Sequence, residues 1–242
     1  MIPLRHFAFA AALVLSSFAV AAAGLTPGEY VMLGGGWGTL KIKPGAQAFS
    51  LETVGANLHT CGVEGKIKGV VGQPDGMLEG ETCTIRFQAK DRDIEVEGEG
   101  EGCRSFCGAR AYFDGKFRLP PAQCVAKALQ KRRNDFLVDY KAKRYEPAYA
   151  KVDSLYGECK EFYDWVSIDA LRNDIALTQL RLGRPADCLK TLQETRAWES
   201  PNEKHLQEES GLPPGDFDTY IGVAKATWTN RKLCEKTLAK MP

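Results

Sequence analysis

The sequence is poor in the residues and motifs that most hydrolases and nucleotide-binding enzymes share. It contains only three histidines in 242 residues. It has no Gly-x-Ser-x-Gly motif for a serine nucleophile and no phosphate-binding P-loop. The glycine run at residues 34–38 lacks the Lys and Ser/Thr of such a loop, so we expect a turn whose Trp37 packs on a sheet or is exposed to a partner. These absences predict a protein that is not an enzyme and uses no cofactor.

Long apolar runs are lacking after residue 23. Residues 1–23 contain one charge, Arg5, then the apolar run 7–20 and then three alanines. This is the layout of a cleavable secretory signal, with cleavage expected between Ala23 and Gly24. The alternative is a membrane anchor, which needs roughly 20 apolar residues, more than this run provides. We therefore expect an exported protein of the bacterial periplasm, without membrane contact after signal cleavage.

A large excess of charge is also absent. The formal net charge is +1, and removal of Arg5 with the signal lowers it to 0. A neutral chain offers no basic surface to a nucleic-acid backbone. The expected partner is therefore an envelope or cell-wall protein, not a nucleic acid.

Cysteine, by contrast, is abundant. Eight cysteines in an oxidising compartment most often pair as disulfides. One alternative is a zinc site, but no Cys-x-x-Cys pair occurs and only His59 and His205 follow the signal. A second alternative is a set of free buried thiols. The predicted disulfide cysteines are Cys61, Cys83, Cys103, Cys107, Cys124, Cys159, Cys188 and Cys234.

The chain divides into two halves with different periodicity. From 24 to 119, glycines recur every few residues and flank short alternating runs, whereas helical spacing prevails after Pro120 and Pro121. We therefore predict an α+β fold. A small antiparallel β sandwich or barrel (residues 24–119) follows the signal peptide (1–23) and precedes an α-helical domain (120–242).

Period-two alternation marks the strands that we expect in the first half. The clearest runs are residues 39–43, 48–54, 82–89 and 93–101.

Two disulfides are expected within this half. We predict that Cys61 pairs with Cys83 across neighbouring strands, because each lies in a strand-like run. Cys103 and Cys107 are four residues apart and are predicted to pair locally. Four cysteines allow three arrangements, so spacing alone leaves the other two open.

The run 93–101 carries five carboxylates that alternate with apolar residues or glycine, so a strand places all five on one face. Three interpretations stay open: a solvated face that protects an edge strand, a negative surface that attracts a cationic partner, and a calcium site. We name this set the acidic ridge and treat it as the candidate partner-binding site: Asp93, Glu95, Glu97, Glu99 and Glu101.

The segment Cys103-x-x-x-Cys107-Gly108, followed by Arg110-Ala111-x-Phe113-x-Gly115, resembles a cysteine-glycine motif of small periplasmic β domains of the lysozyme-inhibitor kind. The chain lacks the serine-glycine loop that several inhibitor families insert into a lysozyme cleft. The resemblance implies a protein that occludes the cleft of a cationic cell-wall hydrolase, which the acidic ridge would contact.

Helical spacing and capping residues place the helices of the second half. We expect helices over about 121–141, from Tyr145 to about Cys159, from an Asp164 cap to Gly183, and from Pro185 onward. Two further helices are expected later in the chain. A Ser-x-x-Glu capping box begins a short helix at Ser200, and a last helix is capped by Asp216 or Asp218.

Residues 143–149 and 183–189 form equivalent turns 40 residues apart in the sequence. They are similar to the tetratricopeptide (TPR) repeat, in which a small residue, here Ala148 or Cys188, lets two helices approach closely. The resemblance implies stacked helix pairs that bind peptides or proteins.

Two disulfides are expected among the helices. Cys124 and Cys159 lie at the start of one helix and the end of the next, and these ends meet in an antiparallel pair. We therefore pair them, and Cys188 pairs with Cys234 by elimination.

The function predicted from these features is an exported, non-catalytic protein-binding or scaffold protein of the periplasm, in a narrower form an inhibitor of a cationic cell-wall hydrolase. One enzymatic alternative stays open. A peptidoglycan-cleaving hydrolase needs only a pair of carboxylates, and 31 acidic residues leave such a pair unidentifiable from sequence.

Overall fold

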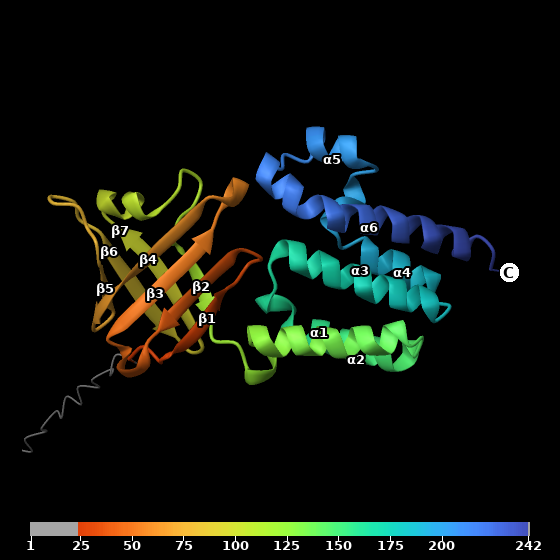
Figure 1. Ribbon diagram of the computed structural model, residues 1–242, viewed down its shortest axis with the longest axis horizontal. Helices are drawn as coiled ribbons and strands as arrows, with labels where there is room; N and C mark the ends of the chain where they lie inside the picture. Colours follow the sequence, from red (N-terminus) through yellow and green to blue (C-terminus); the bar gives the residue numbers. More distant parts are fainter. Residues whose placement is uncertain (1–23, 242) are drawn as a thin grey trace, which may run out of the picture.

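The computed structural model describes residues 24–241, so the predicted signal at 1–23 lies outside the described residues. A β-barrel and a group of helices lie end to end along the long axis of the molecule (Figure 1). The chain passes once from the barrel to the helices, between Arg118 and Ala122. The fold is therefore mixed α and β, with an antiparallel barrel followed by helices.

Eight antiparallel strands close into a barrel in sequence order, and β8 returns to pair with β1. A sandwich and a barrel were equal expectations from the alternation, and the structure shows the barrel. The strands are β1 (Gly28–Met32), β2 (Trp37–Ile42), β3 (Ala48–Val54), β4 (Thr60–Lys68), β5 (Val71–Pro74), β6 (Thr84–Lys90), β7 (Asp93–Glu99) and β8 (Gly115–Arg118).

The barrel interior is filled by the alternating apolar residues of its strands. Phe49 and Leu51 of β3 are buried, as are Ile85 and Phe87 of β6, so the predicted inward faces of both strands are confirmed. Phe49 and Phe87 meet edge to face with ring centroids 5.1 Å apart. Gly72 is required beside them, because a Cβ atom there would lie 2.8 Å from each ring. The inside of the barrel is thus a packed core, and any binding surface lies outside it.

The helical part begins with a short 3₁₀ turn, Ala122–Cys124, and continues in six α-helices within the described residues. Helix α1 packs on α2, α3 packs on α4, and α6 contacts both α3 and α4. The helices are α1 (Ala126–Lys141), α2 (Tyr145–Cys159), α3 (Trp165–Arg181), α4 (Pro185–Leu192), α5 (Glu203–Glu209) and α6 (Pro214–Leu238).

The capping residues in the sequence predicted the start of some helices correctly and of others wrongly. Asp164 caps α3 as predicted, because its side chain accepts from the amides of Val166 and Ser167. The prediction that a capping box begins a helix at Ser200 is wrong. Asn202 is the N-cap of α5, and its side chain accepts from the backbone amide of His205.

Helix α6 also starts elsewhere than predicted. It begins at Pro214, so Asp216 lies inside its first turn and neither Asp216 nor Asp218 is the N-cap.

All eight cysteines form disulfides. The two bridges predicted for the helical part are present, Cys124–Cys159 and Cys188–Cys234. The second bridge joins α4 to α6, which lie side by side.

The pairing predicted for the barrel is wrong, because the bridges are Cys61–Cys107 and Cys83–Cys103. Strand β5 lies between β4 and β6, so Cys61 and Cys83 are not on neighbouring strands. Cys103 of the 3₁₀ segment Glu101–Phe106 bonds instead to Cys83, just before β6, and Cys107, the residue after this segment, bonds to Cys61 of β4.

Four disulfides are compatible with a protein located outside the cytoplasm. Over residues 24–241, no helix has both the length and the apolar character needed to cross a membrane.

Candidate functional site

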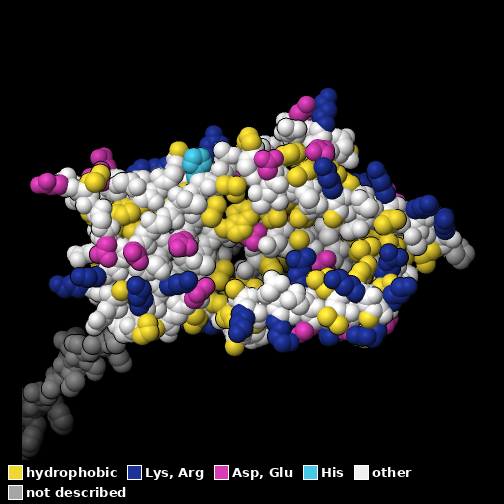
Figure 2. Space-filling view, viewed as in Figure 1, with side chains coloured by type: hydrophobic (Ala, Val, Ile, Leu, Met, Phe, Trp, Pro, Cys, Tyr) yellow, Lys and Arg dark blue, Asp and Glu magenta, His cyan; other side chains and the backbone are white. Residues whose placement is uncertain are grey.

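The candidate site is a cleft at the junction of the barrel and the helices, which we name the junction cleft. Its volume is about 640 Å³, within the roughly 300–1,000 Å³ typical of ligand-binding sites. Figure 2 shows a hollow at this junction, with hydrophobic side chains gathered beside it. Both parts of the molecule contribute walls, so the cleft exists only while the barrel and the helices are docked.

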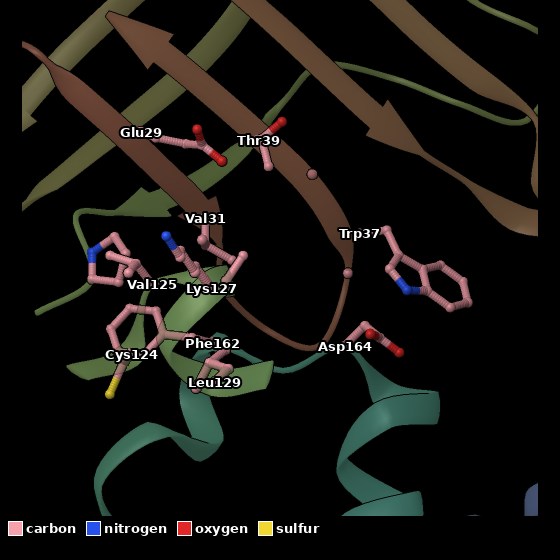
Figure 3. A pocket seen from close by; sticks show the side chains of 14 residues that line it. Glu29, Val31, Trp37, Thr39, Cys124, Val125, Lys127, Leu129, Phe162 and Asp164 are labelled. Atoms are coloured by element: carbon pink, nitrogen blue, oxygen red, sulfur yellow. The ribbon is translucent and has the colours of Figure 1, made fainter. Parts of the chain in front are cut away.

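The barrel wall of the cleft comes from β1, β2 and the turn between them. Val31 of β1 and Trp37 of β2 give it an apolar surface, and Gly36 and Gly38 leave the main chain uncovered (Figure 3). Trp37 also contacts Trp165 of α3 edge to face, with centroids 5.7 Å apart. The expected turn is therefore present, and its tryptophan packs against the helical part while it lines the cleft.

The helical wall comes from the segment that leads into α1 and from the segment before α3. Leu129 and Phe162 form its apolar surface, together with Val125 and the Cys124 side chain (Figure 3). Pro120 completes the lining from the connecting segment. A cleft with apolar residues on both walls favours a ligand that brings an apolar group.

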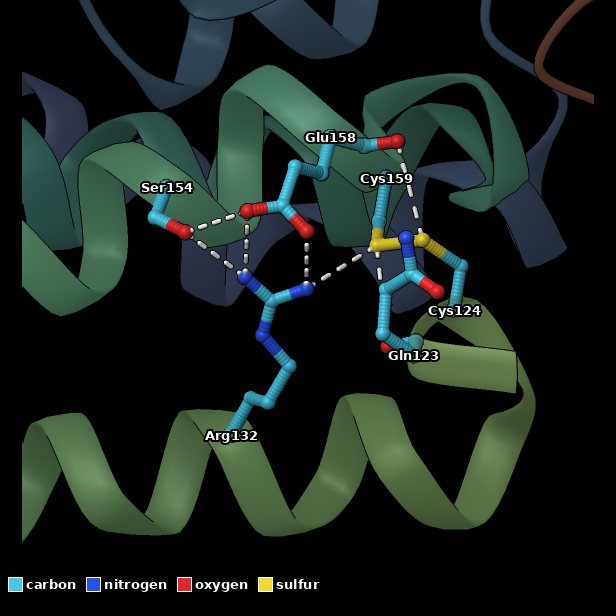
Figure 4. Close-up of a disulfide and its surroundings, with 6 residues drawn as sticks. All are labelled: Gln123, Cys124, Arg132, Ser154, Glu158 and Cys159. Carbon is cyan, nitrogen blue, oxygen red and sulfur yellow. Dashed lines mark hydrogen bonds and ion pairs between the residues drawn. A yellow bond between two sulfur atoms is a disulfide. The ribbon is translucent and has the colours of Figure 1, made fainter. Parts of the chain in front are cut away.

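The Cys124–Cys159 disulfide holds this wall in position (Figure 4). It joins the 3₁₀ turn before α1 to the last residue of α2. Arg132 of α1 reaches across to Glu158 of α2 at 3.2 Å. Hydrogen bonds from Ser154 and then from the Arg132 guanidinium lower the pKa of the Glu158 carboxyl. A disulfide and an ion pair thereby join the first half of α1 and the turn before it to the end of α2.

Three charged side chains line the cleft. Glu29 is 3.5 Å from Lys41, and Asp164 is committed to capping α3. Glu29 and Asp164 lie at opposite ends of the cleft (Figure 3). Lys127 is exposed and forms no ion pair with any residue from 24 to 241. The cleft therefore presents one uncompensated positive charge beside an apolar surface.

A second groove of about 270 Å³ continues the cleft along the helices. Leu129, Phe162 and Asp164 line both spaces. The groove runs between α1 and α3, where Arg133 is paired with Asp174 at 2.9 Å. Burial raises the pKa of the Asp174 carboxyl. The two spaces therefore adjoin, and we call them together the trough.

Four residues of the acidic ridge lie on β7 and Glu101 lies in the 3₁₀ segment that follows, all of them outside this trough. Asp93 is buried and accepts from Arg118 at 2.5 Å and Lys116 at 2.8 Å. The hydrogen bonds from Arg118 and Lys116 hold the pKa of the Asp93 carboxyl well below its usual range, although burial opposes them. Asp93 thus links β7 to β8 and is not available to a partner.

The other ridge residues are flanked by cations of both neighbouring strands. Glu99 pairs with Arg86 of β6, which lowers the pKa of the Glu99 carboxyl. Glu97 lies opposite Arg86 and Glu95 opposite Lys116 in the strand registers. The side chains of Glu95, Glu97 and Glu101 remain exposed. The structure therefore places Asp93, Glu95, Glu97 and Glu99 at alternate positions of one strand, as predicted, and intersperses that face with positive charge. The prediction is wrong for Glu101, because the chain turns at Gly100, which has a φ of 103°, and Glu101 begins a 3₁₀ segment.

The calcium interpretation of the ridge finds no support in the geometry. Across the part of the chain that the structure describes, no three His, Cys, Asp or Glu side chains converge as a metal site would require. Strand β7 is extended from Asp93 to Glu99, and alternate side chains of a strand are about 7 Å apart.

The junction cleft was not predicted from the sequence. Its residues lie in the first two strands, the connecting segment and the starts of two helices, and no motif unites them. The one available signal was Trp37, a large aromatic residue in a glycine-rich turn where it cannot enter the barrel core.

Compared with protein-family models, curated proteins and solved structures, the chain has no significant match.

Proposed function

We propose that this chain is a non-catalytic protein of the bacterial periplasm that binds another envelope protein through the junction cleft. The observation that carries the proposal is the cleft itself. It is an apolar trough between two disulfide-bonded parts, large enough for several side chains of a partner. Four disulfides support a location outside the cytoplasm.

Binding accounts for the cleft better than peptidoglycan hydrolysis does. A glycosidase needs two carboxyl groups roughly 5–10 Å apart on either side of the bond that is cleaved. The carboxylates of the cleft, Glu29 and Asp164, lie at its two ends, and each already has a structural partner. The apolar surface between them suits contact with side chains.

We further propose that the helical part is TPR-like. Helix α1 packs on α2 and α3 on α4, and the small residues Ala148 and Cys188 of the second helix of each pair are fully buried. These contacts support a repeated unit, and α6 covers the last pair. Such stacked pairs offer elongated surfaces to proteins and peptides.

Site-specific photocrosslinking tests the proposal. A benzophenone amino acid at Val125, which lines the cleft and is 40% exposed, is irradiated in periplasmic extract. The matched position is Val138 of α1, which is 61% exposed and lies outside the cleft. We expect a discrete adduct with one protein at position 125 and none at 138. Equal labelling at both positions, or none at 125, would contradict binding through the cleft.

A second candidate is inhibition of a cationic cell-wall hydrolase by the acidic ridge. The exposure of Glu95 and Glu97 on one face of β7, and of Glu101 just beyond its end, favours it. It requires that the purified protein slow lysozyme and that salt weaken the effect. Neutralising Glu95, Glu97, Glu99 and Glu101 together to Gln would then abolish inhibition. If crosslinking at Val125 persists in that quadruple variant, the cleft and not the ridge holds the partner.

A further inference from the structure

The trough has the form of a site for an extended peptide. It joins the junction cleft to the groove between α1 and α3, and Leu129 and Phe162 belong to both. It is open to solvent along its length, with charged side chains of both signs on its rim. An acyl chain favours an enclosed apolar cavity, whereas an extended segment can place successive side chains along an open trough.

The barrel wall offers main-chain groups as well as apolar surface. Gly36 and Gly38 line the cleft with main-chain atoms, so a ligand in the cleft contacts the backbone at the start of β2. Peptide groups of a bound segment find hydrogen-bonding partners in such uncovered backbone. This wall therefore fits a polypeptide.

The apolar residues define what the segment must carry. Val31 and Trp37 lie on one wall and Leu129 and Phe162 on the other. A bulky aliphatic or aromatic side chain between these walls would be shielded from water on two sides. Such anchors supply most of the affinity at protein interfaces.

The charged side chains of the trough indicate which group of the ligand should lie next to its apolar side chain. Glu29 is compensated by Lys41, and Arg133 by Asp174. Asp164 lies at the N-terminus of α3, where the helix dipole favours a negative charge. Lys127 remains without a partner among residues 24–241. A carboxylate of the ligand is the complement to this set.

We propose, on the basis of the proposed function, that the partner segment is an extended peptide with a bulky apolar side chain and an acidic residue close to it. The apolar side chain packs between Trp37 and Phe162, and the carboxylate pairs with Lys127. The site thereby selects apolar-acidic segments and discriminates against apolar-basic ones.

The test uses a phage-displayed library of random linear peptides, selected on the full-length oxidised protein. We expect the enriched peptides to share an aromatic or aliphatic residue followed or preceded within a few positions by Asp or Glu. Selection on Lys127→Glu should replace that acid by Lys or Arg. Lys127 is exposed, so this variant keeps the fold, which its non-reducing disulfide map and circular dichroism verify.

Affinity measurements on one enriched peptide complete the test. Fluorescence polarisation of the labelled peptide should give a Kd about fivefold weaker for Lys127→Glu, the effect of losing one exposed ion pair. Lys190→Glu is the matched control, an exposed lysine on α4 outside the trough, and should leave the Kd unchanged. Replacing the peptide's acid by its amide should weaken binding to the wild type and not to Lys127→Glu.

The outcomes separate this inference from the proposed function. Enriched peptides without an acid, or with an acid preference that Lys127→Glu leaves unchanged, overturn the inference. If crosslinking at Val125 still yields a partner in that case, the proposed function stands and only the assigned chemistry is wrong. If neither peptides nor a partner bind at the trough, both are wrong.

Discussion

At the scale of single residues, Asp169 holds three elements of the helical part together. Its side chain is 2% exposed. It accepts from the Tyr220 hydroxyl of α6 at 2.7 Å, from the Arg196 amide at 2.8 Å and from Arg172 of α3 at 2.8 Å. Burial raises the pKa of the Tyr220 hydroxyl, and the Asp169 charge raises it further, so that hydroxyl stays a donor.

Removing this carboxylate should destabilise the protein. Asp169→Ala leaves the Tyr220 hydroxyl and the Arg196 amide without this acceptor, while the half-buried Arg172 keeps Glu194 at 3.4 Å. The unpaired donors should cost about 2–4 kcal/mol of unfolding free energy. Urea unfolding of the oxidised protein measures the loss. Asp153→Ala, at an exposed position of α2, is the control and should change stability by less than about 0.5 kcal/mol. Equal midpoints for the two variants would show that the network contributes nothing.

Asp93 makes the stability of the folded protein depend on pH below about 4. Its pKa is lowered in the folded protein, mainly by the hydrogen bond from Arg118, so its stabilising effect is complete above the pKa of an unfolded aspartate, about 3.9. The effect is lost as the pH falls from there towards the lower folded-state pKa. We expect Asp93→Asn to lower stability by about 1–2 kcal/mol at pH 7 and to flatten the decline in stability below pH 4. Thermal unfolding from pH 2 to 7 tests this. A parallel pair of curves for variant and wild type would be inconsistent with the assignment.

At the scale of elements, the helices could be predicted wherever the signal is local. Asp164 caps α3 through amides two and three residues away, and Pro185 begins α4. The barrel disulfides could not be predicted, because they depend on which strands are neighbours. The short strand β5, Val71–Pro74, separates β4 from β6, and its four residues carry too little alternation to be recognised in the sequence.

The start of α6 shows why another prediction failed. Its N-cap, Pro213, provides no side-chain hydrogen bond. The side-chain oxygen of Asn57, in the barrel, accepts from the backbone amide of Gly215 at 2.8 Å. The backbone amide of Asn57 donates to the Asp216 carboxylate at 3.2 Å. This is the reciprocal pattern of a capping box, but its two halves are about 160 positions apart in the sequence, with separations of 158 and 159. Asp216 therefore acts in the cap, although not as the residue that begins the helix.

A double-mutant cycle tests this shared cap. Asn57 has a positive φ of 59°, so Asn57→Gly removes the side chain without adding backbone strain. We expect Asn57→Gly and Asp216→Ala each to cost about 1 kcal/mol, and the double variant to cost less than their sum, since the two residues act together. Asp218→Ala, exposed in the same turn, is the control. Strict additivity of the two changes would contradict the reciprocal cap.

The junction cleft, like the cap of α6, could not be predicted, because both depend on contacts between residues far apart in the sequence. The alternation that identified the acidic ridge showed which side chains share a face, and the structure agrees up to Glu99, where β7 ends. It could not show that Arg86 and Lys116 of the flanking strands lie opposite Glu97 and Glu95. The cleft depends on how the barrel docks on the helices, which no local pattern encodes.

At the scale of the whole molecule, the barrel and the helices are each cross-linked internally, and no disulfide joins the two. Their docking therefore rests on non-covalent contacts. Among these are the Trp165 amide, which donates to the Gly35 carbonyl at 3.0 Å, and the Asn57 contacts to the start of α6. Arg118 adds an ion pair to Glu161 at 2.6 Å. Because both parts are rigid, we expect these contacts to break together.

Hydrogen exchange of single amides can show whether docking is cooperative in this way. Trp37→Ala removes the edge-to-face contact with Trp165 and should speed exchange at the Trp165 amide. It should also speed exchange at the Gly215 amide, although that amide is bonded to Asn57 and not to Trp37. A comparable rise at both amides means that they report one opening of the junction. Tyr112→Ala, at an exposed aromatic of the barrel, should change neither rate. Faster exchange at Trp165 alone would mean that the contacts open independently, and the cleft could then widen without separation of the two parts.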